Sequence, residues 1–204
     1  MSVSTCFCNP IGDLAVDPTS GTLIATHPCD CTISILDAED PAAAVAIRVD
    51  GDPVAVAAAG GRAVVATTSA SYDAISVLDI DSKTVLSVHP LAFTVTGIAV
   101  SPDGARAFAA RTGRLGSEVA AVDLATAEIT SIPITASGTS SIDVIRTGAD
   151  GYLYASMCSH RDGELVVVDS ARRRTVATIP VGAPVRDITL SPDGAWAYVL
   201  AHHP

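Results

Sequence analysis

The sequence indicates an all-β protein, a β-propeller of four-stranded antiparallel blades, on three observations. A turn followed by a short apolar strand recurs every 40 to 47 residues. A β-branched run that ends in aspartate recurs with nearly the same period, 42 to 46 residues. The segments between these two signals are rich in the residues of tight reversals, Gly, Pro, Asp and Ser. Four short antiparallel strands in each such unit are typical of a propeller blade.

The recurring turn is clearest where it reads Ser-Pro-Asp-Gly. This motif occupies residues 101–104 and 191–194, and each copy precedes a short apolar strand. Looser copies end in Gly21, Gly61 and Gly151. Proline presets φ and glycine relaxes the turn, so we interpret the motif as structural.

The β-branched runs are closed by Asp37, Asp79, Asp123 and Asp169. Paired carboxylates suit general acid–base catalysis, which makes these residues tempting as catalytic groups. Each one, however, holds the same place in its unit, at the start of a hairpin, where an Asp side chain caps the turn. We therefore interpret the four aspartates as structural.

The repeats divide the chain into four blades and a half-blade within one partial propeller that spans residues 1–204. The expected blades are about 11–53, 54–94, 95–140 and 141–184, followed by a half-blade at 185–204. Such an incomplete propeller leaves bare strand edges at both ends, and bare edges invite association. We expect a fragment, a truncated gene product, a partner chain that completes the ring, or self-association through the open edges.

Composition and charge narrow the classes of partner. The 204 residues are 49% hydrophobic and 17% charged, with a formal net charge of −10. An acidic chain repels phosphate backbones and anionic lipids, so no nucleic-acid or membrane partner is predicted. The bias toward Arg over Lys, and toward Ala, Val and Asp, resembles that of a high-GC, actinobacterial-like bacterial genome.

The chain shows no targeting or membrane-spanning segment. No apolar run approaches the ~20 residues of a membrane span. The first eight residues lack the basic flank and apolar core of a signal peptide. A cytoplasmic location is therefore predicted, and export applies if the N-terminus has been trimmed.

Residues 175–182 read Thr-Val-Ala-Thr-Ile-Pro-Val-Gly and form the last expected strand of the fourth unit. With the Ser-Pro-Asp-Gly turns, this strand resembles, almost verbatim, the YVTN-type propeller repeats of bacterial YncE-like proteins. The nearest copy of the naming tetrapeptide is Tyr-Val-Leu-Ala at residues 198–201. The resemblance covers residues 11–204 and implies a seven-bladed ring. It leaves the function open, because one propeller fold hosts many roles.

Candidate ligand-binding residues lie in the loops between the second and third strands, which we expect to share a face with the loops between blades. The candidates are His27, Tyr72, Arg111, Arg114, His160, Arg161 and His202. Two arginines in the polar loop from Arg111 to Glu118 could hold a carboxylate or phosphate. An ordinary solvated loop is the interpretation that we favour.

A metal site is the second candidate, since zinc and copper prefer Cys and His ligands. The weak candidates are Cys29, Cys31, Cys158 and His160. The spacing is Cys-x-Cys rather than that of zinc sites, so neither a metal nor a cofactor is predicted. The alternatives are buried thiols, ordinary loop histidines or, after export, a disulfide from Cys6 or Cys8 to Cys29 or Cys31.

Aspartates also recur at the start of the first strand in three blades. Asp13, Asp143 and Asp187 hold this position, and Gly97 replaces the acid in the third blade. A ring of carboxylates around the channel could hold calcium. We favour the alternative that they accept hydrogen bonds from backbone amides between blades.

The functional prediction is a non-enzymatic binding or scaffold protein that presents its loop-rich face to a protein or small ligand. No nucleophile elbow, zinc-protease motif, phosphate loop or dinucleotide motif occurs, and the first strands are almost wholly apolar. The alternative, implied by related propeller families, is an enzyme or electron-transfer subunit of the lactonase-like or quinoprotein and metal-dependent dehydrogenase types.

Overall fold

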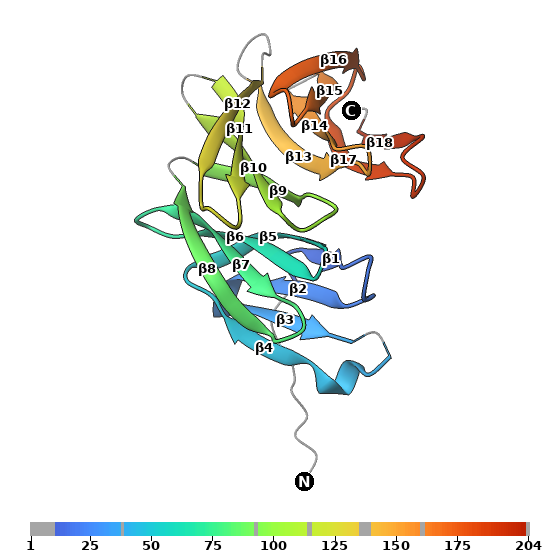
Figure 1. The fold of residues 1–204 in the computed structure, drawn as a ribbon. Helices are drawn as coiled ribbons and strands as arrows, with labels where there is room; N and C mark the ends of the chain where they lie inside the picture. The colour runs from blue at the N-terminus through green and yellow to red at the C-terminus, as the bar shows by residue number, and fades with distance from the viewer. Residues whose placement is uncertain are drawn as a thin grey trace.

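Consecutive strands pair antiparallel within each sheet of the molecule. The computed structural model describes residues 11–37, 39–91, 94–113, 116–134, 140–159 and 162–202. These residues form four four-stranded sheets and one two-stranded sheet, and each sheet keeps its strands in chain order. Figure 1 shows the sheets following one another from the N-terminal to the C-terminal end. An incomplete propeller of about four and a half blades is therefore confirmed.

The first two blades have the following strands. Blade 1 contains β1 (Leu14–Val16), β2 (Leu23–His27), β3 (Thr32–Leu36) and β4 (Val45–Arg48), with short 3-10 helices η1 (Pro28–Asp30) and η2 (Pro41–Ala43). Blade 2 contains β5 (Asp52–Ala59), β6 (Arg62–Thr68), β7 (Asp73–Asp79) and β8 (Thr84–Leu91). Among the described residues, neither helix has the length that crossing a membrane requires.

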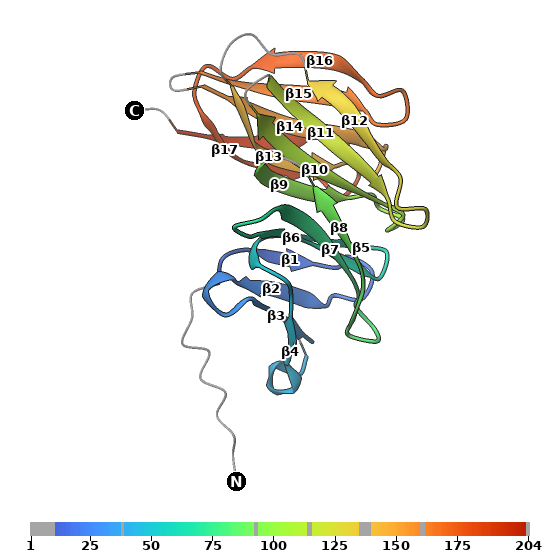
Figure 2. The ribbon, with the colours of Figure 1, turned by 90° about the vertical axis from the view of Figure 1, so that its left-hand side faces the viewer.

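The remaining strands complete two blades and half of a fifth. Blade 3 contains β9 (Thr94–Val100), β10 (Arg106–Gly113), β11 (Gly116–Asp123) and β12 (Ile129–Ile134). Blade 4 contains β13 (Ser141–Thr147), β14 (Tyr152–Cys158), β15 (Gly163–Asp169) and β16 (Arg174–Pro180). Blade 5 contains β17 (Val185–Leu190) and β18 (Ala197–Ala201). The first strands of neighbouring blades lie side by side (Figure 2).

The aspartates that close the β-branched runs cap hairpins, as their positions predicted. Asp123 Oδ1 accepts the backbone N–H groups of Ala125 and Thr126 at 3.0 Å. These bonds, led by the one from Thr126, hold the pKa of Asp123 below its ordinary value. The other three aspartates accept the N–H two or three residues ahead in the same way: Glu39 to Asp37, Ser82 to Asp79 and Arg172 to Asp169.

The Ser-Pro-Asp-Gly turns close on themselves through the aspartate. Ser101 Oγ donates to Asp103 Oδ1 at 2.5 Å, and the Ala105 N–H donates to the same oxygen at 3.0 Å. Gly104 adopts φ +68, a left-handed conformation that favours glycine. The structural interpretation of this motif is therefore confirmed.

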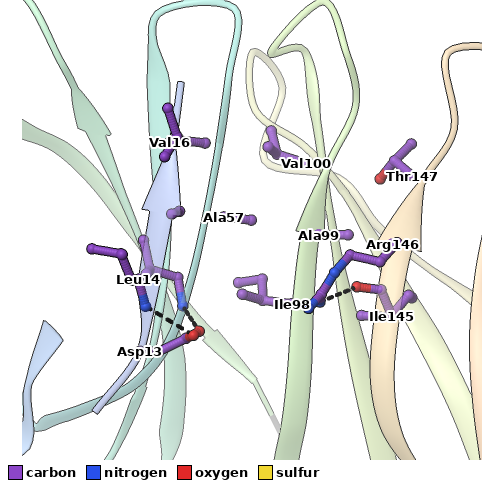
Figure 3. Close-up of a pocket in the computed structure, with 13 residues that line it drawn as sticks. Asp13, Leu14, Val16, Ala57, Ile98, Ala99, Val100, Ile145, Arg146 and Thr147 are labelled. Atoms are coloured by element: carbon purple, nitrogen blue, oxygen red, sulfur yellow. Dashed lines mark hydrogen bonds between the residues drawn. The ribbon is translucent and has the colours of Figure 1, made fainter. Parts of the chain in front are cut away.

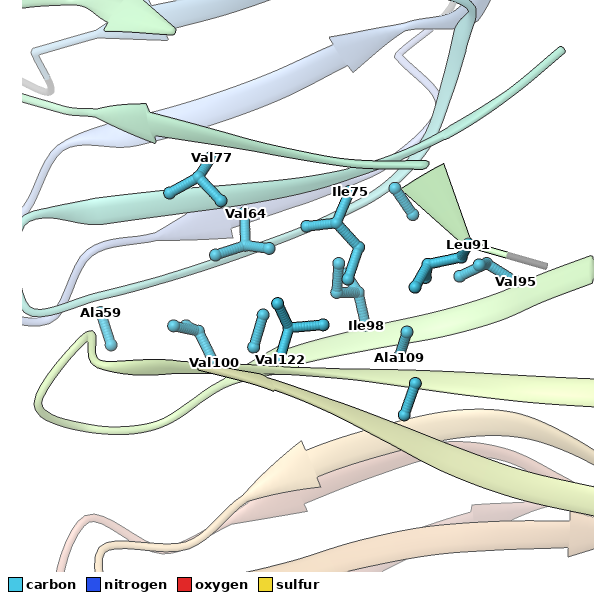
Figure 4. Packing of buried hydrophobic residues seen from close by; sticks show 13 residues of the cluster. Ala59, Val64, Ile75, Val77, Leu91, Val95, Ile98, Val100, Ala109 and Val122 are labelled. Carbon is cyan, nitrogen blue, oxygen red and sulfur yellow. The ribbon is translucent and has the colours of Figure 1, made fainter. Parts of the chain in front are cut away.

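The hydrophobic core lies between neighbouring sheets, one cluster to each interface. Figure 4 shows Val64 and Ile75 of blade 2 facing Ile98 and Val122 of blade 3. Most side chains in these clusters are Val, Ile and Ala, and β-branched residues of this size pack well on a pleated surface. Each blade is thus buried by its neighbours rather than by a single common core.

Candidate functional site

The loops of blades 1 and 2 are joined into one surface by side-chain hydrogen bonds. The Tyr72 hydroxyl, in the loop after β6, donates to Asp50 Oδ2 at 3.0 Å in the connection between the blades. Cys31 Sγ, at the end of η1, donates to Asp52 Oδ1 at 3.4 Å. These bonds place the second-to-third-strand loops on the same face as the connection between blades. The Tyr72 ring remains exposed there, and its bond to Asp50 raises the pKa of the phenol.

Two of the candidate residues on this face bond within their own hairpins. His27 is buried at the end of β2, and its Nε2 lies 2.9 Å from Ser34 Oγ on β3. Arg111 forms an ion pair with Glu118 on the adjacent strand. The predicted loop from Arg111 to Glu118 is therefore wrong in its bounds, because both residues lie within paired strands. Their side chains stabilise the hairpin end rather than a long polar loop.

Three candidates lie outside the described residues: Arg114, His160 and Arg161. The three described cysteines differ in their exposure to solvent. Cys29 is exposed, Cys31 is half-buried, and Cys158 is buried at the end of β14. Among the described residues, no three His, Cys, Asp or Glu side chains gather as metal ligands would.

Cys158 bonds to the next blade. The Val185 N–H of β17 donates to Cys158 Sγ at 3.3 Å, and the thiol donates back to the Val185 carbonyl at 3.4 Å. Burial raises the pKa of this thiol. The residue therefore connects blade 4 to blade 5 as a neutral hydrogen-bonding group.

The same connection recurs at two other blade boundaries. The Val95 N–H donates to Asp73 Oδ2 at 2.9 Å, and the Ile142 N–H donates to Thr112 Oγ1 at 3.3 Å. In each case a side chain at the end of one blade's hairpin accepts an amide from the first strand of the next. Pro53 holds the donor position in blade 2, as its place just before the β5 bulge indicates, and proline has no N–H to donate.

His202 lies at the acceptor position of blade 5. Ala201 pairs with Val185, as Arg111 pairs with Val95 and as Met157 pairs with Ile142. The residue that follows is His202 in blade 5, Thr112 in blade 3 and Cys158 in blade 4. Its position in the repeat is thus that of a residue that contacts the next blade.

The aspartates at the start of the first strands also bond across or beside blade boundaries. Asp13 accepts the N–H of Leu14 and, with its other oxygen, the Val56 N–H of blade 2, both at 2.9 Å. Asp187 accepts the N–H of Ile188 and an ion pair from Arg146 of blade 4, both at 2.8 Å. The preferred interpretation, hydrogen bonding to backbone amides between blades, is confirmed for Asp13.

Asp143 does not share their position. Gly97 pairs with Ala110 and Asp187 pairs with Leu200, each just after a bulge. In blade 4 the corresponding residue is Val144, whose N–H bonds to Ser156 Oγ at 2.8 Å. Asp143 lies one residue earlier, within the bulge, where it accepts a hydrogen bond from Ser141 Oγ at 2.6 Å. The predicted three-fold recurrence is therefore wrong, because the bulge shifts the register of β13.

A cavity of ≈ 280 Å³ lies between the first strands of blades 1 to 4 (Figure 3). Its walls are largely Ala, Val, Leu and Ile, with polar groups at Asp13, Arg146 and Thr147. Arg146 was not among the predicted site residues. It is the one cation that the first strands bring to this cavity, where blades 1 to 3 carry alanine, so an alignment of the repeats would have found it.

A second cavity, of ≈ 480 Å³, lies between blades 3 and 4 beside a Ser-Pro-Asp-Gly turn. Its polar side chains are Ser101, Asp103, Arg106, Asp123, Thr147 and Ser170. Hydrogen bonds, from Ser101 first, lower the pKa of Asp103, and hydrogen bonds from its own hairpin, from Thr126 first, lower the pKa of Asp123. Both carboxylates therefore already serve the local turns.

No family model matches the chain. The chain is 32% identical over 225 residues to the seven-bladed β-propeller protein Rv1057 of Mycobacterium tuberculosis, which aligns with 94% of this chain and 57% of that protein. The chain thus spans less than two thirds of the length of this relative.

Solved structures resemble the described fold over nearly all of the chain. Kuenenia stuttgartiensis hydrazine synthase matches with a TM-score of 0.76 and 23% identity, covering 98% of this chain and 58% of that one. The Cps50 (Swd1) β-propeller domain of Myceliophteria thermophila matches with a TM-score of 0.76 and 15% identity, covering 95% and 64%. Identities at this level bear on the fold alone.

Proposed function

We propose that this chain, which belongs to the β-propeller proteins, is a non-enzymatic binding or scaffold protein whose loop-rich face contacts a protein or small ligand. Membership of the YVTN-type repeats, a single partial propeller over residues 1–204 and a cytoplasmic location are parts of the same proposal. A partner chain, or self-association, at the open blade edges is a further part of it.

The observation that carries the proposal is the exposed ring of Tyr72. Its hydroxyl is held by Asp50 from the connection between blades 1 and 2, while the ring faces solvent. A tyrosine fixed in this way offers apolar area at low conformational cost, which is why tyrosine is enriched at interfaces. The surface is preorganised for binding, since the loop of blade 1 and the loop of blade 2 are each already bonded to the connection between the blades.

The charge around Tyr72 favours a ligand with basic groups. Asp50 and Asp52 lie on the same surface, and the whole chain carries a formal net charge of −10. A cation could contact both the carboxylates and the face of the ring. Complementary charge of this kind raises the association rate and depends on ionic strength.

The alternative, an enzyme or electron-transfer subunit, needs polar groups that can act on a substrate. The candidates for such work bond to other parts of the protein instead. Asp13 binds backbone amides, Arg111 pairs with Glu118, and Cys158 bonds to Val185. These contacts support a binding role over catalysis.

The test is a thermal-shift screen of the chain with octa-arginine peptide, zinc, copper and calcium chlorides, phosphate, and a sugar lactone. We expect the peptide to raise the melting temperature by about 2–4 °C at low salt, which corresponds to about 1 kcal/mol for a chain of this size. Tyr72→Ala removes this shift, and Tyr198→Ala, at the other end of the chain, leaves it. Turnover of the lactone above the buffer rate would instead favour the enzyme, and a shift that Tyr72→Ala leaves intact would exclude this surface.

A further inference from the structure

We propose that the cavity between blades 3 and 4 binds a small zwitterion, an amino acid whose carboxylate pairs with Arg106 and whose ammonium group contacts Asp103 and Asp123. This cavity lies beside the turn that precedes β10, at the opposite end of the strands from the loop-rich face. The proposal goes beyond the loop-rich face and does not depend on it.

The cavity lies between two complete blades and results from one small residue. Blades 3 and 4 are both four-stranded and lie side by side (Figure 1). In blades 2 and 3 the residue after the closing aspartate is Ile80 or Leu124, and each packs into the core cluster shared with the preceding blade. The equivalent residue of blade 4 is Ser170, which lines the cavity instead. The space that an aliphatic side chain fills at the two earlier boundaries therefore stays open at this one.

The hydroxyl of Ser170 is bonded within its own blade. The Leu124 N–H donates to the Ala105 carbonyl oxygen at 3.0 Å. At the matching place in blade 4, Ser170 Oγ donates to the Gly151 carbonyl oxygen at 2.7 Å. This bond turns the short side chain toward its own hairpin, so that it does not fill the gap between the blades.

Arg106 brings an unpaired cation to the cavity. Its backbone pairs with the closing Asp123, as that of Arg62 pairs with Asp79 in blade 2. Arg62 forms an ion pair with Asp79, whereas the Arg106 side chain forms no hydrogen bond or ion pair within the described part of the chain. Arg106 is exposed and lines the cavity, so its guanidinium donors can hold a carboxylate in bidentate geometry.

Asp103 and Asp123 favour an ammonium group beside that carboxylate. Both hydrogen bonds from the turn to Asp103 reach Oδ1, and both backbone bonds from the hairpin to Asp123 also reach Oδ1. The second oxygen of each carboxylate can therefore accept a hydrogen bond from a ligand. A simple anion would be repelled by the two aspartates, and a simple cation by Arg106, so a ligand that carries both charges is complementary to the cavity.

Thr147 adds a polar group to the wall of the cavity. Its Oγ1 is buried and has no hydrogen-bond partner among the described residues. The equivalent residues of blades 1 to 3, by the pairing of first and second strands, are all apolar: Val16, Ala58 and Val100. A buried hydroxyl without a partner is unfavourable, and rotation about χ1 would turn this one toward a polar group bound in the cavity.

The rest of the lining suits an aliphatic side chain. The volume of ≈ 480 Å³ lies within the range of small-molecule sites, about 300–1,000 Å³. The apolar side chains of the lining are Pro102, Ala105, Phe108 and Ala149. Leucine, which combines the two charges with an aliphatic side chain, is therefore the probe.

Isothermal titration calorimetry with L-leucine tests the proposal. We expect a dissociation constant below about 1 mM. At about pH 6.5 the amine of L-leucinamide is protonated, so this compound lacks only the carboxylate, and N-acetyl-L-leucine lacks only the ammonium group. Each should bind at least about tenfold more weakly than leucine. Equal binding of the three compounds, no binding of leucine, or binding of D-glucose in its place would overturn the proposal.

Matched variants locate the site. Arg106→Gln should weaken leucine binding at least about tenfold, and it should melt like the parent because the position is exposed. Arg62→Gln is the control at the equivalent position of blade 2, where Ile80 fills the boundary, and it should leave binding unchanged. Ser170→Leu restores an aliphatic residue and should abolish binding without lowering the melting temperature.

The outcomes of these variants decide the proposal independently of the loop-rich face. Equal weakening by Arg106→Gln and Arg62→Gln would show an effect of net charge alone and refute the site. A Ser170→Leu variant that binds leucine like the parent would refute it as well. Tyr72→Ala should leave leucine binding unchanged, so a failed peptide shift at the loop-rich face and a failed leucine titration are separate results.

Discussion

Phe108 and Tyr198 hold the same position in two blades, but Phe108 is buried and Tyr198 is exposed. Phe108 pairs with Ala99 in blade 3, and Tyr198 pairs with Thr189 in blade 5. Phe108 is 2% exposed because blade 4 covers it, whereas Tyr198 is 61% exposed. The burial of a residue in this fold is thus set by the next blade and not by its own strand. Repeats that contact only their neighbours behave in this way.

A second contrast separates the boundary between blades 3 and 4 from the boundary between blades 4 and 5. Between blades 3 and 4, Ser117 Oγ donates to the Ser140 carbonyl at 2.7 Å. Between blades 4 and 5 the equivalent residue is Gly163, where an added Cβ would lie 2.2 Å from the Ala183 carbonyl oxygen. The same boundary is built with a side-chain bond in one place and with close backbone approach in the other.

The largest expected effect separates Phe108 from Tyr198. Phe108→Ala should lower the free energy of unfolding by about 3–5 kcal/mol, because it leaves a cavity between two blades. Tyr198→Ala should change it by less than about 0.5 kcal/mol. Urea denaturation of both variants measures the difference. Equal losses would mean that the exposed face of blade 5 is already covered.

Gly163→Ala should cost about 2 kcal/mol, since the backbone of Ala183 has to move away from the new methyl group. Ser117→Ala is the control at the equivalent position, and it should cost about 1 kcal/mol for the lost hydrogen bond. Thermal melts rank the two variants. The reverse ranking would show that the boundary between blades 4 and 5 is looser than described.

Variants of Cys158 test whether the boundary between blades 4 and 5 needs a hydrogen-bond acceptor for the Val185 N–H. Cys158→Val leaves the buried Val185 N–H without its partner and should cost about 1–3 kcal/mol. Cys158→Thr supplies the hydroxyl that Thr112 uses at the equivalent position and should cost less. The two variants are compared by urea denaturation. Identical losses would assign the effect to packing alone.

The smallest effect is on the acid stability of the hairpin caps. Hydrogen bonds, from Thr126 and from Arg172 first, hold the pKa values of Asp123 and Asp169 below their ordinary values. A lowered folded-state pKa contributes stability that is present above the unfolded-state pKa of about 4 and is lost as the pH falls below it. Asp169→Asn should flatten that decline slightly in melts between pH 5 and pH 2, by about 1 °C. A steeper decline would contradict this role.

Much of the fold could be predicted because it depends on short stretches of consecutive residues. The hairpin caps at Asp123 and Asp169 and the Ser-Pro-Asp-Gly turns each depend on a few consecutive residues. Their period fixed the number of blades, and the apolar runs between them fixed the strands.

The site was harder to predict because it depends on contacts between blades. No residue type in the sequence marks the bulge that shifts Asp143 out of register. The polar composition of residues 111–118 suggested a long loop. In the structure Arg111 and Glu118 lie on paired strands and form an ion pair across the hairpin. The contact of Cys158 with blade 5 depends on the register of the strands. The sequence pattern defines that register only to within one residue.

Pro53 has a consequence for how such a ring is assembled and redesigned. It lacks the amide that other blades donate. The residue of blade 1 that matches the acceptors Thr112 and Cys158 is Pro28, which has no side-chain acceptor, and Cys31, which matches the acceptor Asp73, donates to Asp52 instead. Neither Pro28 nor Cys31 therefore depends on the amide that Pro53 lacks. Blades are therefore not interchangeable. A blade that is transferred to a new position needs the donor residue and the acceptor residue of its boundary to be transferred with it.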